Sequence, residues 1–198
     1  MVSRISSFLL FFLFTRSMLL PSEALGVQEI ETHLHLYLHE NFTGPCPTSI
    51  SVVMPNNNLS SFGTIRVFAN ELREGPEPAS KLIGQSQGMG TTASRDEGSS
   101  LVEANFVFTD GKYTGSTLAI FGRPVRLPLS TWEVSVIGGT GQFRLARGYA
   151  LGKNLLVVPG KTIVVEFDLY FKHPCDRCCS FSSCVDSKAP SAAYCFQE

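Results

Sequence analysis

A histidine pair followed by a carboxylate is the pattern in this chain that most suggests chemistry. His33 and His35 are two residues apart, so an extended segment would place both imidazoles on one face, and Glu40 follows shortly after them. Imidazole and carboxylate groups at such spacing could bind a divalent metal. Glu40, however, has the opposite parity to the histidines, and the distant His173 stands alone beside a proline. A metal site is therefore the alternative, and we predict neither a metal nor another cofactor.

The same segment predicts a strand with one buried face. Leucines at positions 34, 36 and 38 alternate with the histidines, and Glu40 shares their parity, so a carboxylate ends an apolar row. An acid at the rim of an apolar cavity can exchange a proton with a ligand held there. Glu40 is thus a candidate general acid. The alternative is an ordinary solvated acid beside the turn that begins at Asn41.

The glycine-rich stretch 138–141 lacks what a phosphate-binding loop needs. Neither a helix pattern nor a Lys-Ser/Thr pair follows it. Its glycines accept positive φ angles, so we expect the chain to reverse there as a hairpin, with Phe143 on the outgoing strand. Nor does a Gly-x-Ser-x-Gly elbow accompany the histidines, so the sequence does not indicate nucleophilic catalysis.

Composition and the N-terminus indicate the type of protein. The 198 residues carry a net charge of −1 and are 43% hydrophobic, which suits one well-cored domain. Without a basic stripe, nucleic acid and anionic membrane surfaces are not expected as partners. Residues 1–24 combine Arg4, an apolar run and a small-x-small site ending at Ala24, which predicts a cleaved secretory signal. We expect a secreted, extracellular protein.

The cysteines fit that location. Five of the six lie in a tail, 173–198, which follows the domain expected at 25–172. Cysteines of a secreted chain predict disulfide bonds, whereas zinc at the Cys-x-x-Cys spacing of the tail would need reduced thiolates. Two sequons, at Asn41 and Asn58, predict N-glycans. The disulfide candidates are Cys46, Cys175, Cys178, Cys179, Cys184 and Cys195.

Short strands separated by turn residues fill the rest of the chain. Sustained helical periodicity is absent, and the pattern predicts an all-β sandwich or barrel. The turn Thr109-Asp-Gly111 gives the strongest hairpin signal. The expected strands are 31–40, 49–54, 62–68, 82–89, 101–108, 115–121, 132–137, 143–151 and 162–171.

An ordered set of short motifs resembles the plant dirigent proteins. The most recognisable block is Ile137-Gly-Gly-Thr-Gly141 with Phe143-Arg144 and Ala146-Arg-Gly148. The resemblance extends from about Leu34 to Phe171. The other matching blocks are Tyr37-Leu-His-Glu40, Phe62-Gly63, Ile83-Gly84 with Gln87-Gly88, Phe108, Tyr113-x-Gly115-Ser116, Gly122-Arg123 and Glu133.

This resemblance implies a fold and a function. Dirigent proteins are eight-stranded antiparallel barrels that associate into small oligomers, dimers or trimers. They position phenoxy radicals, made from monolignols by a separate laccase or peroxidase, so that one enantiomer of a lignan forms in the apoplast. On this resemblance we expect a non-enzymatic auxiliary protein, with Glu40 transferring a proton at most. Candidate walls for the pocket are Leu36, Leu38, Phe108, Phe121 and Phe143.

Several positions depart from the family pattern. Glu40 replaces the usual aspartate, Asn70 stands in an often acidic pair, and Gln85 replaces an arginine. Pro124 occupies the region of a second acid, and Trp132 takes the place of an arginine. These differences leave a second function open, namely a non-catalytic secreted barrel that binds a small molecule or stiffens the cell wall. A metal-binding protein similar to cupins is the third alternative.

Overall fold

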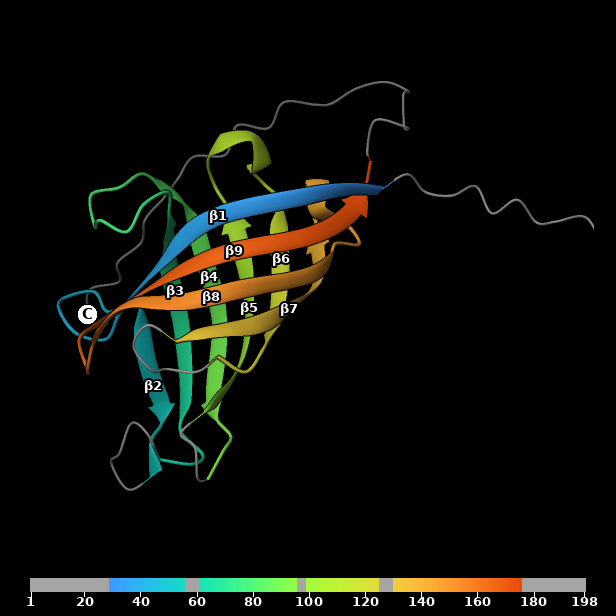
Figure 1. Ribbon diagram of the computed structural model, residues 1–198. Helices are drawn as coiled ribbons and strands as arrows, with labels where there is room; N and C mark the ends of the chain where they lie inside the picture. The colour runs from blue at the N-terminus through green and yellow to red at the C-terminus, as the bar shows by residue number, and fades with distance from the viewer. Residues whose placement is uncertain (1–28, 56–60, 96–98, 125–129, 176–198) are drawn as a thin grey trace, which may run out of the picture.

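The computed structural model describes residues 29–55, 61–95, 99–124 and 130–175, and these form an all-β domain (Figure 1). The expected signal at 1–24 and the tail beyond Cys175 lie outside these ranges. The strands are β1 (Glu29–Asn41), β2 (Ser49–Val53), β3 (Ile65–Arg73), β4 (Leu82–Thr92), β5 (Ser100–Phe108), β6 (Thr117–Gly122), β7 (Thr131–Thr140), β8 (Arg147–Val158) and β9 (Thr162–Pro174).

Eight of these strands close into an antiparallel barrel. Neighbours run in the order β1-β9-β8-β7-β6-β5-β4-β3, and β1 pairs with β3 to complete the circle. That closing pairing is short, because it joins only Tyr37–His39 to Glu71–Arg73. Further along β3, β2 pairs where β1 has left, with Ile50 opposite Val67. The predicted eight-stranded barrel is confirmed, with β2 as an additional strand.

Alternation along each strand separates the inside of the barrel from the outside. On β9, Phe167, Leu169 and Phe171 are buried, whereas Asp168 between them is only half-buried and faces outward. Burying an apolar side chain of this size contributes about 1.5–3 kcal/mol to folding. The apolar inward residues of β1, β3 and β5 to β9 together make one core.

An aromatic plug, made of Phe108, Tyr113, Phe143 and Phe171, fills one end of the barrel. Two short 3₁₀ helices, η2 (Gly111–Tyr113) and η3 (Gly141–Phe143), carry two of its rings. The Phe143 ring centroid lies 4.7 Å from that of Tyr113, 5.6 Å from that of Phe108 and 5.0 Å from that of Phe171.

In the described ranges, no helix is long and apolar enough to cross a membrane.

The glycine-rich stretch reverses later than the sequence predicts. β7 continues to Thr140, so the first two glycines are strand residues, and the turn comprises η3 and Leu145, whose φ is 58°. A Cβ on Gly139 would lie 2.5 Å from the carbonyl oxygen of Phe143. Close packing, rather than a turn, therefore requires glycine there. β8 begins at Arg147 instead of Phe143, whose side chain belongs to the aromatic plug.

Candidate functional site

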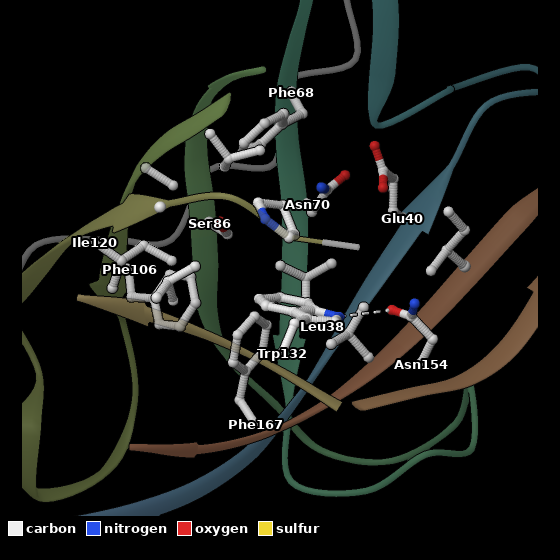
Figure 2. A pocket seen from close by; sticks show the side chains of 17 residues that line it. Leu38, Glu40, Phe68, Asn70, Ser86, Phe106, Ile120, Trp132, Asn154 and Phe167 are labelled. Carbon is white, nitrogen blue, oxygen red and sulfur yellow. Dashed lines mark hydrogen bonds between the residues drawn. The ribbon is translucent and has the colours of Figure 1, made fainter. Parts of the chain in front are cut away.

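A cavity lies inside the barrel, further along the strands from the aromatic plug, and Figure 2 shows the side chains that line it. The space between its walls is about 650 Å³, a figure that includes open solvent at the mouth. Its walls come mainly from apolar and aromatic residues. These are Leu38, Phe68, Val102, Ala104, Phe106, Ile120, Pro124, Trp132, Val134, Ile163, Val165 and Phe167.

Three of the aromatic rings pack edge to face along one wall. The ring of Trp132 lies 5.3 Å from that of Phe167 at an interplanar angle of 86°, and Phe167 lies 5.5 Å from Phe106 at 75°. Trp132 stands over Gly152, its register partner on β8, where a Cβ would be 2.5 Å from the indole. Its Nε1 donates to Asn154 Oδ1 at 3.4 Å. The wall is thus a fixed aromatic surface.

Glu40 carries the only ionisable group among the described residues that line the cavity. The end of β1 places it there with 7% of its surface exposed, and its Cα is in register with that of Ile163. Its carbonyl oxygen accepts a hydrogen bond from Thr162 Oγ1 at 3.0 Å. No described residue forms a hydrogen bond or ion pair with its carboxylate. A carboxyl in this position can exchange protons with a bound molecule.

Neutral polar groups on β3 and β4 complete the lining. Asn70 and Ser86 are register partners on these adjacent strands, and both are buried. In Figure 2 Asn70 lies between Ser86 and Glu40. The barrel therefore holds a small polar region within apolar and aromatic walls, which is the usual composition of a site that orients an organic ligand.

The predicted wall residues are only partly brought together. Leu38 and Glu40 line the cavity. Leu36 is buried in the core but is not among the lining residues, and Phe108 and Phe143 belong to the aromatic plug. Phe121 is wrong as a wall residue: it is 41% exposed and faces outward. Its neighbour on β6, Ile120, takes the inward position instead.

Most of the lining residues carry no recognisable sequence motif, although one signal in the sequence points to the site. Of the positions that depart from the dirigent pattern, Glu40, Asn70, Pro124 and Trp132 line the cavity, whereas Gln85 does not. Departures from the family pattern thus gather where a ligand would sit. Ser86 and Asn154 carried no signal, because a lone serine or asparagine in a strand has no distinctive spacing.

The histidine pair lies on the outer surface, away from Glu40. His33 Nε2 and His35 Nδ1 each donate to Asp168 Oδ1 at 2.9 Å. Burial raises the pKa of Asp168, but the hydrogen bonds from the two histidines outweigh it and hold that pKa below its usual value. Within the described ranges, His, Cys, Asp and Glu side chains form no group of three or more that could hold a metal ion. The cupin-like set is therefore not assembled.

The modification sites are described only in part. Asn41 ends β1 and is half-buried, whereas Asn58 lies outside the described residues, as do Cys178, Cys179, Cys184 and Cys195. Cys46 is disulfide-bonded and Cys175 carries a free thiol. Glycosylation and the pattern of cysteine pairing remain predictions.

Comparison with known proteins gives a consistent set of relatives. Residues 31–172 match the family model described as "Dirigent-like protein". Pterocarpan synthase 1 of Glycyrrhiza echinata is 40% identical over 75% of this chain and 82% of its own length. Dirigent protein 1 of Arabidopsis thaliana is 42% identical over 72% of this chain and 79% of its own. A solved structure of a pterocarpan synthase dirigent protein superposes with a TM-score of 0.71 at 38% identity, covering 75% of this chain and 93% of that one.

These relatives overturn one expectation. On the sequence resemblance we expect an auxiliary protein without enzymatic activity of its own. Yet pterocarpan synthases of Glycyrrhiza echinata and of Glycine max, the latter 38% identical over 75% of this chain, are named as catalysts. The prediction of a non-enzyme is therefore wrong.

Proposed function

The chain belongs to the dirigent-like protein family, and on that premise we propose that it is a catalyst that acts on phenolic molecules. The barrel binds an oxygenated aromatic compound in its inner cavity and directs the formation of one stereoisomer. The observation that carries this proposal is the composition of the cavity, in which a single carboxylate lies among apolar and aromatic walls.

The walls supply orientation. Trp132, Phe106 and Phe167 hold an aromatic ring by apolar contact and edge-to-face packing, which restricts the faces that can react. Holding reactants in one geometry removes translational and rotational freedom before the reaction, and this lowers the barrier of the favoured orientation. Selectivity follows, because the other orientations do not fit the same cavity.

Glu40 supplies proton transfer. A quinone methide forms from a phenol by oxidation, or from a phenol–alcohol by loss of water. Bond formation at the methide carbon moves a proton from the attacking group to the ring oxygen. The Glu40 carboxylate can accept the proton of the attacking group and then donate a proton to the ring oxygen. Because no described residue pairs with the Glu40 carboxylate, it remains available to the substrate.

Two substrates are supported by different observations. Family membership favours monolignol radicals, supplied by an external laccase or peroxidase and coupled to a lignan, as part of phenylpropanoid metabolism. The relatives named pterocarpan synthase favour an intramolecular ring closure that forms a pterocarpan. Both reactions need a bound phenol and a proton carrier, so the same site serves either one.

The test runs both reactions with the purified protein. One arm contains coniferyl alcohol and a laccase, and the other contains the ring-opened phenol–alcohol form of a pterocarpan without any oxidant. Chiral chromatography measures the enantiomeric excess and yield of each product. We expect one arm to give an enantiomeric excess that requires the protein. If both arms give racemic product or unreacted substrate although the protein binds the ligand, the protein is the non-catalytic binding barrel instead.

Glu40→Gln tests the role of the carboxyl. The substitution keeps the size of the side chain and removes its ability to exchange a proton, so we expect the yield of the selective product to fall by about 10²-fold, within the usual range for acid–base catalysis. Glu103→Gln is the matched control, because Glu103 is exposed on the outer face of β5. Equal losses in the two variants, or none in Glu40→Gln, would contradict the role.

The cellular setting is part of the same proposal. The protein is a secreted, disulfide-containing glycoprotein of the plant apoplast that self-associates as a small homo-oligomer. The N-terminal signal, the sequons, the cysteines and the family resemblance support these features. Glycosidase digestion, thiol titration and light scattering of the protein recovered from plant extracellular fluid would each check one of them.

A further inference from the structure

Ser86 has a hydroxyl without a partner in the protein. It faces the cavity from β4, only 1% of the residue is exposed, and its Oγ forms no hydrogen bond. Leaving a buried hydroxyl unpaired costs free energy that an alanine of nearly the same shape would avoid. The unpaired hydroxyl therefore indicates a polar ligand atom beside it.

Asn70 points a donor toward the same place. The Asn41 N–H donates to Thr48 Oγ1 at 2.8 Å, and Thr48 Oγ1 in turn donates to Asn70 Oδ1 at 2.8 Å. This chain fixes the orientation of the Asn70 amide, so its Nδ2 is left to donate elsewhere. Among the described residues, no acceptor bonds to Nδ2, although Asn70 is 2% exposed.

The two donors are direct neighbours across a strand pair. Asn70 and Ser86 are register partners, which places their side chains about 5 Å apart on the inner face. Glu40 approaches the same row from β1, where that strand parts from β3. Two neutral donors thus lie next to each other on the inner face, and the carboxyl of Glu40 lines the same cavity.

We propose that Ser86 Oγ and Asn70 Nδ2 together bind the ring oxygen of a phenolic ligand. This oxygen is the hydroxyl of the free phenol and the carbonyl oxygen of its quinone methide. The inference rests on the proposed function and adds the atom that the site recognises. Two uncharged donors suit an oxygen that is neutral when it binds and becomes negative during the reaction.

The pair also acts on the reaction itself. When a substrate hydroxyl attacks the methide carbon, a C–O bond forms, the methide π electrons move into the ring, and the ring oxygen becomes a phenolate. The proton of the hydroxyl passes to the Glu40 carboxylate, which then returns a proton to the phenolate. Oxidant and reductant are not consumed. Ser86 and Asn70 stabilise the negative charge between these two transfers, as donors in an oxyanion hole do.

A binding cycle tests the pair without any turnover. Coniferyl alcohol and 3-methoxycinnamyl alcohol differ only in the oxygen at ring position 4. Their dissociation constants are measured by calorimetry, and quenching of Trp132, the single tryptophan of the chain and a lining residue, locates them in the cavity. Loss of the ring oxygen should weaken binding to the natural protein about tenfold, because two buried donors lose their acceptor.

Variants assign that effect to residues. In Ser86→Ala, loss of the ring oxygen should weaken binding threefold or less. Asn70→Asp, which keeps an oxygen next to Thr48 but removes the donor, should also reduce the effect. Ser49→Ala is the matched control, because Ser49 Oγ is likewise buried and unpartnered but does not line the cavity, and it should keep the tenfold effect.

The outcomes separate this inference from the proposed function. If the natural protein binds both alcohols equally, or Ser86→Ala keeps the full tenfold effect, the pair does not contact the ring oxygen and the inference fails alone. If the natural protein binds neither alcohol, the phenolic pocket fails and the inference with it. Circular dichroism of each variant shows whether the barrel is intact.

Discussion

Ser86 and Ser49 are two buried hydroxyls that folding does not use. By contrast, the buried side chain of Asn70 takes part in a hydrogen-bond network, because its Oδ1 accepts from Thr48 Oγ1. A hydroxyl without a partner lowers stability, and a chain that keeps it at a cavity wall exchanges stability for the ability to bind a ligand there.

Ser86→Ala should therefore stabilise the ligand-free protein. Removing an unpaired buried hydroxyl should raise the free energy of unfolding by about 1 kcal/mol, and Ser49→Ala should do the same. Urea denaturation with and without coniferyl alcohol measures both variants. The ligand should stabilise Ser49→Ala as much as the natural protein and Ser86→Ala less. A Ser86→Ala variant less stable than the natural protein without ligand would show that the hydroxyl has a structural partner.

Strands β7 and β8 determine the shape of the cavity through Gly152. The absence of a side chain there lets the indole of Trp132 lie against β8 and reach Phe167. An aromatic residue that covers a glycine on the neighbouring strand restores packing that the glycine lacks. The depth of the cavity therefore depends on a residue that itself contacts no ligand.

Gly152→Ala should push the Trp132 ring into the cavity. The new methyl group would lie 2.5 Å from the indole, so we expect a loss of stability of about 1–3 kcal/mol, a shift in tryptophan emission and weaker binding of coniferyl alcohol. Gly138→Ala, on β7, is the control, because the nearest atom to its Cβ is 4.0 Å away. Unchanged emission and affinity in Gly152→Ala would show that the ring has room to move elsewhere.

Acidic pH should weaken the pairing of β1 with β9, because the contribution of Asp168 is lost there. Its pKa is lowered in the folded state, so its contribution to stability is complete above pH about 3.8 and is lost as the pH falls through the lowered value. Between pH 6 and pH 3 the free energy of unfolding should therefore fall in both proteins. The fall should be about 0.5 kcal/mol smaller in Asp168→Asn than in the natural protein, after allowance for solvent screening. Denaturation curves at the two pH values measure this difference. In the control Glu103→Gln, the free energy of unfolding should fall by as much as in the natural protein.

Across the whole molecule, local pattern predicted the strands but not the depth of each side chain in the barrel. The alternation of 31–40 correctly placed Leu38 and Glu40 on the inner face, because leucines and histidines differ in polarity. In the run Leu118-Ala-Ile-Phe121 both faces are apolar, so the sequence does not show which residues point inward, and the prediction of Phe121 as a wall residue is wrong. Phe106 and Phe108 point inward from the same strand, yet Phe106 lines the cavity whereas Phe108 belongs to the aromatic plug. Position along the barrel axis depends on the register between distant strands, which a single sequence does not reveal.

The short pairing of β1 with β3 also bears on how a ligand enters. β1 is held to β9 along its whole length, from Glu29 to Asn41, but to β3 only between Tyr37 and His39. Fewer hydrogen bonds have to break at such a place than elsewhere in the barrel. Local opening of the wall should therefore occur between β1 and β3 first. Amide hydrogen exchange should be faster at 71–73 than along β8 and β9, and a ligand in the cavity should slow it. Because Glu40 follows directly after this pairing, the weakest part of the wall lies beside the carboxyl that we propose transfers the proton.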